Sequence, residues 1–307
     1  MTTKAENIHG EFLEKESGEK IFLLHSPSKL VKTYGHVIIV PPYGRNAHNS
    51  VFLTQYLVQN GFDVTRFDPR FSVGRSTGNV EKYKLSVVQQ DLMTVIEHIE
   101  DSLNVPLCIL TMSLSSPVAW RVANKVPKIQ SVVTTVGVID IVDTVEKAAK
   151  DELFLSERCE MYRRGELFDP SHTMMTEVLG LDIYGQEFVA DLVNNDFCNA
   201  SSVLEDIKSL QIPTHMIFAG NDKWVRPDLV EQAKQLSLKG SQNIVIPDLP
   251  HDFGGNAVAA KRICEKIVKL ILQEFCQEYE VTPFFPRVVD IVRSASVEAK
   301  YISKMIC

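Results

Sequence analysis

The sequence predicts an α/β fold with a mostly parallel, doubly wound sheet. Strand-like and helix-like segments alternate along most of the chain, which is typical of parallel strands joined by crossover helices. Two strand candidates, residues 36–40 and 106–111, are nearly continuous apolar runs, as expected of strands covered on both faces. A length of 307 residues is sufficient for one large domain with an insertion, or for two domains. The functional site of such a fold lies at the carboxyl ends of its strands.

Residues 1–149 are expected to form the first part of the core. Gly61 would end the first helix, and Pro117 stands in the first turn of the third. The predicted strands are residues 20–24, 36–40, 62–67, 106–111 and 130–138, and the predicted helices begin at residues 51, 86, 116 and 141.

The pattern changes between residues 150 and 208, where helical periodicity continues without a strand-like run. This segment is too long for an ordinary crossover between neighbouring parallel strands, and it carries many large apolar residues. We therefore expect a helical lid inserted into the core.

The strand-helix alternation resumes after this segment. Residues 209–280 are expected to form the second part of the core, and residues 281–307 a tail packed on it. The predicted strands here are residues 214–219 and 243–246, and the predicted helices are residues 229–238 and 257–275.

Composition and charge exclude several classes of protein. A net charge of −7 and the lack of a basic run longer than two residues argue against a nucleic-acid binder. The six cysteines form no C-x-x-C pair, so we expect buried free thiols in a reducing cytoplasm. The first residues lack the apolar core of a signal peptide, and no uncharged apolar run reaches about 18 residues, so neither secretion nor a membrane span is predicted. Metal and nucleotide motifs are absent, and we expect neither a metal nor a cofactor.

Ser113 lies where the apolar strand 106–111 turns sharply into a helix. Such a corner raises a serine hydroxyl out of the sheet and aims the first free N–H groups of the helix at a substrate oxygen. The local pattern is T-x-S-x-S, with Thr111 and Ser115 where G-x-S-x-G has its glycines. Ser113 is therefore a candidate nucleophile of a serine hydrolase of the α/β type.

A serine nucleophile needs a base and an acid, and both follow it along the chain. Asp222 and His251 come directly after the last two predicted strands. The order Ser, Asp, His is that of α/β hydrolases. Asp140, which follows an earlier strand, is the alternative acid. Among the other histidines, His48 alone is expected near the mouth of the site.

Two backbone N–H groups are expected to bind the oxyanion that develops during acyl transfer. One belongs to Leu114, directly after the nucleophile. The second should come from the loop after the strand 36–40, which begins with two prolines that have no N–H group. Tyr43 is the first residue of this loop that can donate, and Arg45 beside it is a candidate substrate-binding residue.

Several segments together resemble one known family. They are YGRNAHNSVFLTQYLVQNGFDVTRFD, SLSSPVAW after a strand, TTVGVIDIVDTVEKA, AGNDKWV and PHDFGGN. Nearly end to end, the chain resembles the acyl transferase of bacterial bioluminescence, in the family of myristoyl-acyl-carrier-protein thioesterases. The resemblance implies an α/β-hydrolase fold with a lid, and a triad at the matching positions Ser113, Asp222 and His251. It also implies release of a long-chain fatty acyl group from carrier protein or coenzyme A, for use by a fatty acid reductase.

Our main hypothesis is a cytoplasmic serine acyl hydrolase or acyltransferase that cleaves acyl thioesters through an acyl-Ser113 intermediate. Two alternatives stay open, namely a polyketide-pathway hydrolase with the same triad and a hydrolase-fold binding protein without turnover. The apolar side chains of the lid form either an ordinary helical core or the wall of an acyl tunnel. Phe154, Met174 and Met175 are the candidate substrate contacts in such a tunnel.

A basic patch would be needed if the acyl group arrives on an acidic carrier protein, because the chain as a whole is negative. The candidate residues are Lys147, Lys150, Arg158, Arg163 and Arg164, and their alternative interpretation is a solvated helix face.

Overall fold

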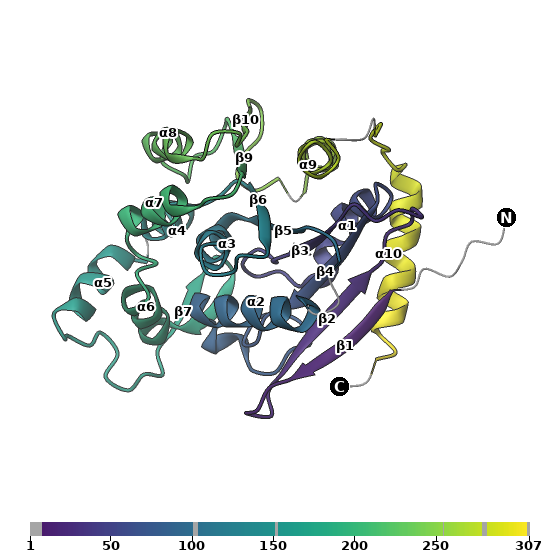
Figure 1. Cartoon of the computed structure of the whole chain (residues 1–307). Helices are drawn as coiled ribbons and strands as arrows, with labels where there is room; N and C mark the ends of the chain where they lie inside the picture. Colours follow the sequence, from purple (N-terminus) through teal and green to yellow (C-terminus); the bar gives the residue numbers. More distant parts are fainter. Residues whose placement is uncertain (1–7, 101–103, 151–152, 254, 278–280, 306–307) are drawn as a thin grey trace.

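The computed structural model describes residues 8–100, 104–150, 153–253, 255–277 and 281–305. These residues build an eight-stranded sheet with the order β1-β2-β4-β3-β5-β6-β9-β10 (Figure 1). β1 pairs antiparallel with β2 and β2 with β4, whereas all further neighbours are parallel, so the predicted mostly parallel sheet is confirmed. Its strands are β1 (His9–Glu14), β2 (Lys20–Ser26), β3 (Gly35–Ile39), β4 (Phe62–Asp68), β5 (Leu107–Met112), β6 (Ile129–Thr135), β9 (Thr214–Ala219) and β10 (Asn243–Ile246).

Helices cover both faces of this sheet (Figure 1). Side chains alternate between the faces along each strand, so Val37 and Ile39 pack with α1 and α9, while Ile38 and Val40 pack with α2 and α3. The α-helices are α1 (Val51–Val58), α2 (Leu85–Glu100), α3 (Ser116–Ala123), α4 (Ile141–Ala148), α5 (Leu155–Arg163), α6 (Gly185–Asn194), α7 (Ala200–Ser209), α8 (Pro227–Leu236), α9 (Ala257–Phe275) and α10 (Val288–Ile302).

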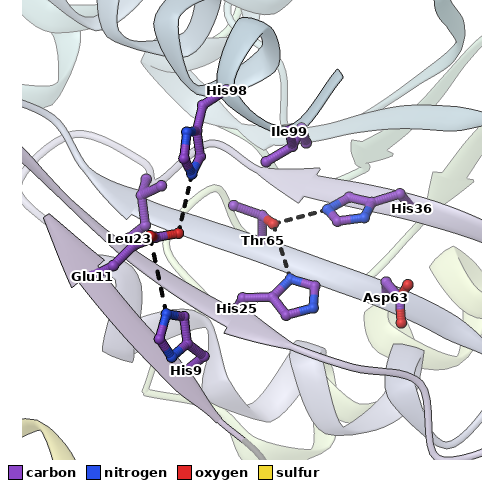
Figure 2. A pocket seen from close by; sticks show the side chains of 9 residues that line it. All are labelled: His9, Glu11, Leu23, His25, His36, Asp63, Thr65, His98 and Ile99. Atoms are coloured by element: carbon purple, nitrogen blue, oxygen red, sulfur yellow. Dashed lines mark hydrogen bonds and ion pairs between the residues drawn. The ribbon is translucent and has the colours of Figure 1, made fainter. Parts of the chain in front are cut away.

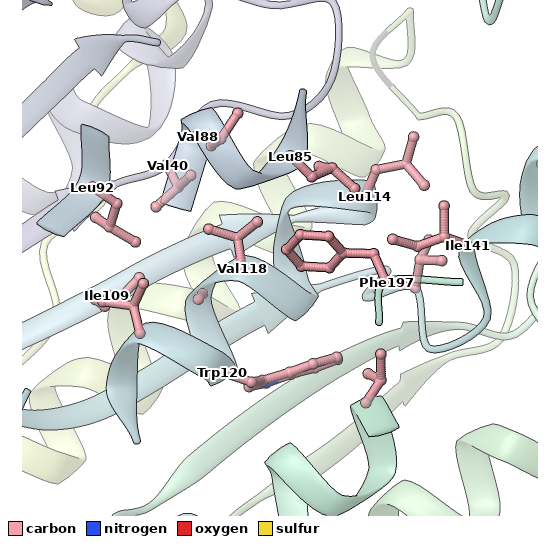
Figure 3. Close-up of a cluster of buried hydrophobic side chains, with 14 of the residues drawn as sticks. Val40, Leu85, Val88, Leu92, Ile109, Leu114, Val118, Trp120, Ile141 and Phe197 are labelled. Atoms are coloured by element: carbon pink, nitrogen blue, oxygen red, sulfur yellow. The ribbon is translucent and has the colours of Figure 1, made fainter. Parts of the chain in front are cut away.

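The segment between β6 and β9 shares the hydrophobic core of the sheet. Phe188 of α6 and Phe197 after it are buried in the same cluster as Ile109 of β5 and Trp120 of α3, part of which is seen in Figure 3. Most buried apolar side chains of this segment therefore pack as an ordinary core.

The same segment also contains a β-hairpin, where the sequence was expected to have no strand. β7 (Met175–Val178) pairs antiparallel with β8 (Leu181–Tyr184) in a sheet of its own. Leu179 and Gly180, which join the strands, both have positive φ, of 49° and 85°, as a two-residue turn of type I′ requires. Four-residue strands carry too little alternation to stand out from the helical pattern around them.

Two further elements were not predicted as regular structure. β1 forms the edge of the sheet, and α10 makes a helix of the tail that packs against α1 (Figure 1). A buried ion pair anchors α10, because Arg66 of β4 donates to both carboxylate oxygens of Glu298, at 2.8 and 2.7 Å. Both side chains are completely buried, and His48 contacts the same carboxylate, its Nδ1 lying 2.9 Å from Oε1.

Removing the charge of Glu298 should destabilise the fold strongly. Glu298→Gln leaves the buried guanidinium of Arg66 without its counter-charge, and we expect the free energy of unfolding to fall by about 3–5 kcal/mol. Urea unfolding followed by circular dichroism measures this change. The matched control is Asp290→Asn on the same helix, because the pair of Asp290 with Arg287 is exposed and should contribute nothing measurable.

The difference in the free energy of unfolding between wild type and Glu298→Gln should also become smaller in acid. Burial by itself raises the pKa of Glu298, but the hydrogen bonds from His48 and Arg66 outweigh it and hold the pKa below its ordinary value. Such a carboxylate stabilises the fold at pH values above the pKa that it has in the unfolded chain, about 4.3. This stabilisation is lost as pH falls through the lower pKa that it has in the folded protein. The proposed role of Glu298 in anchoring α10 would be contradicted if Glu298→Gln did not lower the free energy of unfolding. It would also be contradicted if the difference from wild type stayed constant down to low pH.

Candidate active site

Ser113 stands on a strained corner between β5 and α3. Its φ of 52° lies in the left-handed region that residues with a Cβ rarely adopt. A short turn, Ser113–Ser115, leads directly into α3, which begins at Ser116 with Pro117 in its first turn. The strain costs about 1–2 kcal/mol, and burial of β5 and α3 on both sides holds the corner in place.

The fold brings Ser113, His251 and Asp222 into one chain of hydrogen bonds. Ser113 Oγ lies 2.8 Å from His251 Nε2, and His251 Nδ1 lies 2.7 Å from Asp222 Oδ2. A carboxylate can only accept, so Nδ1 carries the proton, and in the neutral imidazole Nε2 is free to accept from the serine hydroxyl. This arrangement has the donors and acceptors that a nucleophile, a base and an orienting acid need.

The environment of Asp222 favours its ionised form. Burial raises the pKa of Asp222, but the hydrogen bond and the charge of His251 lower it, as do the N–H groups of Trp224 and Val225, and the net pKa is below the ordinary value. These two N–H groups donate to Oδ1 at 2.9 and 3.1 Å, which leaves Oδ2 for His251. The indole ring of Trp224 lies against the imidazole, with 4.8 Å between ring centroids.

Close packing of two loops places Asp222 beside His251. β9 and β10 are parallel neighbours, so the loops that follow them leave the sheet side by side. Gly220 donates its N–H to the carbonyl of Ile246 at 2.8 Å, and a Cβ on Gly220 would lie 2.6 Å from Cα of Pro247. Only a residue without a side chain fits this approach, and no local sequence pattern around Gly220 indicates the constraint.

The two candidate oxyanion donors belong to turns that are tied together. Leu114 follows Ser113 and is buried, and the hydroxyl of Ser115 donates to the carbonyl of Pro41 at 2.7 Å. Tyr43 lies in a turn closed by the Arg45 N–H and the Pro42 carbonyl, 3.1 Å apart. The φ of 69° at Gly44 makes this a type II turn with Tyr43 at its second position.

The side chain of Tyr43 connects this turn to the hairpin. Its hydroxyl donates to the carbonyl of Val178 at 2.9 Å, and its ring packs edge to face against Tyr83. Burial raises the pKa of Tyr43, so the phenol stays protonated and remains a donor. The β7–β8 hairpin therefore lies against the loop that carries a candidate oxyanion donor.

Other polar candidates have different partners. Asp140, the alternative acid, is the N-cap of α4 and accepts from the N–H of Asp143 at 3.0 Å. His48 pairs with Glu298, as described above. Figure 2 shows four more histidines, His9, His25, His36 and His98, around a cavity of about 280 Å³ beside β1 and β2. Across the described residues, no His, Cys, Asp and Glu side chains are grouped to hold a metal ion.

The candidate substrate contacts do not line a closed tunnel in this structure. As whole residues, Phe154, Met174 and Met175 are 61, 38 and 40% exposed, and Arg45 is exposed on the loop after β3.

Much of the predicted basic patch is paired. Arg163 contacts Glu160, Arg164 contacts Glu166 and Lys147 contacts Asp143, while the guanidinium of Arg158 stacks 5.0 Å from the ring centroid of Phe168. These carboxylates reduce the positive field that the arginines and lysines could present to an acidic partner.

A mostly parallel sheet with a serine corner after β5, an aspartate after β9 and a histidine after β10 defines an α/β-hydrolase fold. Solved structures agree at the level of the fold. A monoacylglycerol lipase of Paleococcus ferrophilus superposes with a TM-score of 0.66 at 14% identity, over 83% of this chain and 99% of its own. The thioesterase domain from the curacin biosynthetic pathway superposes with a TM-score of 0.57 at 16% identity, over 87% of this chain and 99% of its own.

The acyl transferase family profile matches residues 16–282, and the chain belongs to this family. An acyl transferase of Aliivibrio fischeri is 26% identical over 284 residues, which are 91% of this chain and 89% of the relative. The acyl transferase of Shewanella woodyi is 27% identical over 234 residues, 76% of this chain and 73% of the relative. The resemblance seen in the sequence is confirmed, and the protein is an acyl-transfer enzyme. Among the described helices, none has the length and apolar character needed to cross a bilayer.

Adding a methyl group at Gly220 should separate the loop after β9, which carries Asp222, from the loop after β10, which carries His251. Gly220→Ala forces its Cβ against the backbone of Pro247, and we expect a loss of about 1–3 kcal/mol in the free energy of unfolding. The proton NMR signal of the His251–Asp222 hydrogen bond should shift or broaden in the same variant. Gly255→Ala is the control, because a Cβ there would meet nothing within 4 Å. Suppose that both variants have equal free energies of unfolding and the NMR signal of the His251–Asp222 hydrogen bond is unchanged. The arrangement of the two loops would then not depend on the close approach of Gly220 to Pro247.

Proposed function

We propose that this chain is a serine acyl hydrolase or acyltransferase that takes its acyl group from a thioester of acyl carrier protein or coenzyme A. The hydrogen-bonded chain of Ser113, His251 and Asp222 is the observation that carries the proposal. Membership of the acyl transferase family supports acyl transfer as the reaction. The resemblance to the acyl transferase of bacterial bioluminescence supports a long-chain fatty acyl group, a cytoplasmic location and a fatty acid reductase as the partner.

The first half of the proposed reaction acylates Ser113. The serine oxygen attacks the thioester carbonyl carbon while His251 Nε2 takes the hydroxyl proton. Asp222 stabilises the resulting imidazolium through Nδ1–H. The backbone N–H groups of Leu114 and Tyr43 bind the oxyanion of the tetrahedral intermediate. The intermediate then collapses, the C–S bond breaks, and His251 returns the proton to the leaving thiolate.

The second half of the reaction releases the acyl group. His251 deprotonates water or another hydroxyl or thiol acceptor, which attacks the carbonyl carbon of acyl-Ser113. The same two N–H groups bind the second oxyanion, and the serine leaves with the proton from His251. Hydrolysis and transfer therefore differ only in the acceptor that reaches the site.

Residues 150–208 are proposed to act as a lid between the two parts of the core, residues 1–149 and 209–280, with residues 281–307 packed outside. The contact of Tyr43 with Val178 supports this role, since it places the β7–β8 hairpin against the oxyanion loop. Phe154, Met174 and Met175 are exposed and apolar, so an acyl chain that contacts them would remove apolar surface from water. Arg45 is proposed to meet the phosphate of the pantetheine carrier.

Replacing Ser113 should abolish turnover without harming the fold. We expect Ser113→Ala to reduce hydrolysis of acyl thioesters by roughly four to six orders of magnitude, and His251→Ala by nearly as much, because the two act as a unit. Ser116→Ala is the matched control, since the hydroxyl of Ser116 is buried without a hydrogen-bond partner and its loss should leave the rate nearly unchanged.

The measurement compares acyl-coenzyme A and acyl carrier protein substrates of graded chain length and β-oxidation state, together with a fluorophosphonate label. Labelling at Ser113 with turnover of saturated chains supports the proposal. Preference for β-keto chains would indicate the polyketide alternative. Absence of both labelling and turnover in the folded wild type would contradict an enzymatic role and leave the binding-protein alternative.

Removing the N–H group of residue 43 should test the second oxyanion donor. Proline suits the second position of a type II turn, so Tyr43→Pro deletes the donor while keeping the turn. Tyr43→Ala loses the same aromatic side chain but retains the N–H group. We expect kcat of Tyr43→Pro to be about 10²–10³-fold below that of Tyr43→Ala, with KM similar in both. Equal kcat values would assign the second donor to another residue.

A further inference from the structure

Two cysteines that are distant in sequence lie near the place where α5 packs against α6. Cys159 lies in α5 and Cys198 in the turn after α6, and both are free thiols. Cys159 lies one turn before Arg163 on the same face of α5, and the guanidinium of Arg163 contacts Cys198, so the two thiols lie close together. Cys159 is only 2% exposed, whereas Cys198 is partly open to solvent.

Arg163 makes the sulfur of Cys198 different from the other described thiols. Its Nη2 donates to Cys198 Sγ at 3.0 Å. The neighbouring thiol of Cys159 lowers the pKa of Cys198, and the charge and hydrogen bond of Arg163 add to this, although burial opposes it. The neighbouring sulfur of Cys198, together with burial, raises the pKa of Cys159. Cys198 therefore combines a cationic hydrogen-bond donor with access to solvent, whereas Cys159 is buried.

The remaining described cysteines lack this arrangement. Cys108, Cys264 and Cys276 are buried, and burial raises the pKa of each. Oxidants react with thiolates that solvent can reach, so these three residues serve as internal references for Cys198.

We propose that Cys198 is a site of oxidation by hydroperoxides and that Cys159 is its resolving partner. The Cys198 thiolate attacks the distal peroxide oxygen, the O–O bond breaks, and the departing alkoxide or hydroxide takes a proton. Cys198 is then a sulfenic acid. The sulfur of Cys159 loses its proton and attacks the sulfur of Cys198, the S–O bond breaks, and the oxygen leaves as water. In total, two thiols and one hydroperoxide give one disulfide, one alcohol or water, and one further water.

The disulfide would join α5 covalently to the turn after α6. Both elements lie between β6 and β9, so the bond would cross-link the segment that covers one end of the core. Neither sulfur takes part in the hydrogen-bonded chain of Ser113, His251 and Asp222. Oxidation of this cysteine pair is therefore independent of the proposed acyl transfer. It can be followed by the masses of the cross-linked peptides, without a measurement of enzyme activity.

Peptide mapping after treatment with one equivalent of hydrogen peroxide tests the proposal. Trypsin should place Cys159 in peptide 159–163 and Cys198 in peptide 165–208. We expect these peptides to be joined after alkylation without reductant, and to separate when dithiothreitol is added. Joined peptides in the monomer support the proposal. Alkylation of both residues after peroxide, oxidation of Cys108, Cys264 or Cys276 in preference to Cys198, or a link between two chains would each overturn it.

Two variants separate the roles within the pair. In Cys159→Ser, peroxide should leave a sulfenic acid at Cys198 that dimedone traps, whereas Cys198→Ser should leave Cys159 reduced. Arg163→Gln should slow formation of the disulfide at neutral pH by about tenfold, because less thiolate is present. Arg164→Gln is the matched control, since Arg164 pairs with Glu166 and should leave the rate unchanged. Equal rates in the two arginine variants would contradict activation by Arg163.

Discussion

The parallel register of β3, β5, β9 and β10 is the constraint on which the site depends. Parallel strands end at the same edge of a sheet, so groups that follow them in the chain collect there. Ser113 leaves β5, Asp222 leaves β9 and His251 leaves β10, while Tyr43 lies in the loop after β3. No side-chain attraction is needed to bring these residues together across the sequence, because the sheet has already placed their backbones.

Short tertiary contacts then refine this placement to hydrogen-bond distances. Ser115 occupies a position that is glycine in the usual serine corner, and here its hydroxyl binds the carbonyl of Pro41. The substitution thus adds a bond between the turn of Ser113 and the loop that leads to Tyr43. Gly220 has the opposite role, since the absence of a side chain lets the loops of Asp222 and His251 touch. Thr111, the other departure from glycine, has a buried hydroxyl without a partner, and nothing in the structure explains it.

The sequence predicts what is periodic or ordered along the chain. The continuous apolar run of β5 and the order Ser, Asp, His were enough to propose the sheet and to select three residues that the structure brings together. The hairpin β7–β8 and the edge strand β1 were missed because short or partly polar strands have weak alternation. The pair of Arg66 and Glu298 could not be predicted, since no local pattern links β4 to the last helix. Gly220 was missed for the same reason, because its constraint comes from Pro247 on another strand's loop.

Charge distribution limits how an anionic carrier could approach the proposed site. The chain has a net charge of −7, and Arg163, Arg164 and Lys147 each have a carboxylate in contact. Each such pair acts as a weak dipole, so the net negative charge dominates the field within the Debye length of about 10 Å at 0.1 M salt. Long-range steering therefore disfavours both coenzyme A and an acidic carrier protein. Recognition must depend on contacts made after encounter, for which the exposed guanidinium of Arg45 lies two residues beyond the proposed oxyanion donor Tyr43.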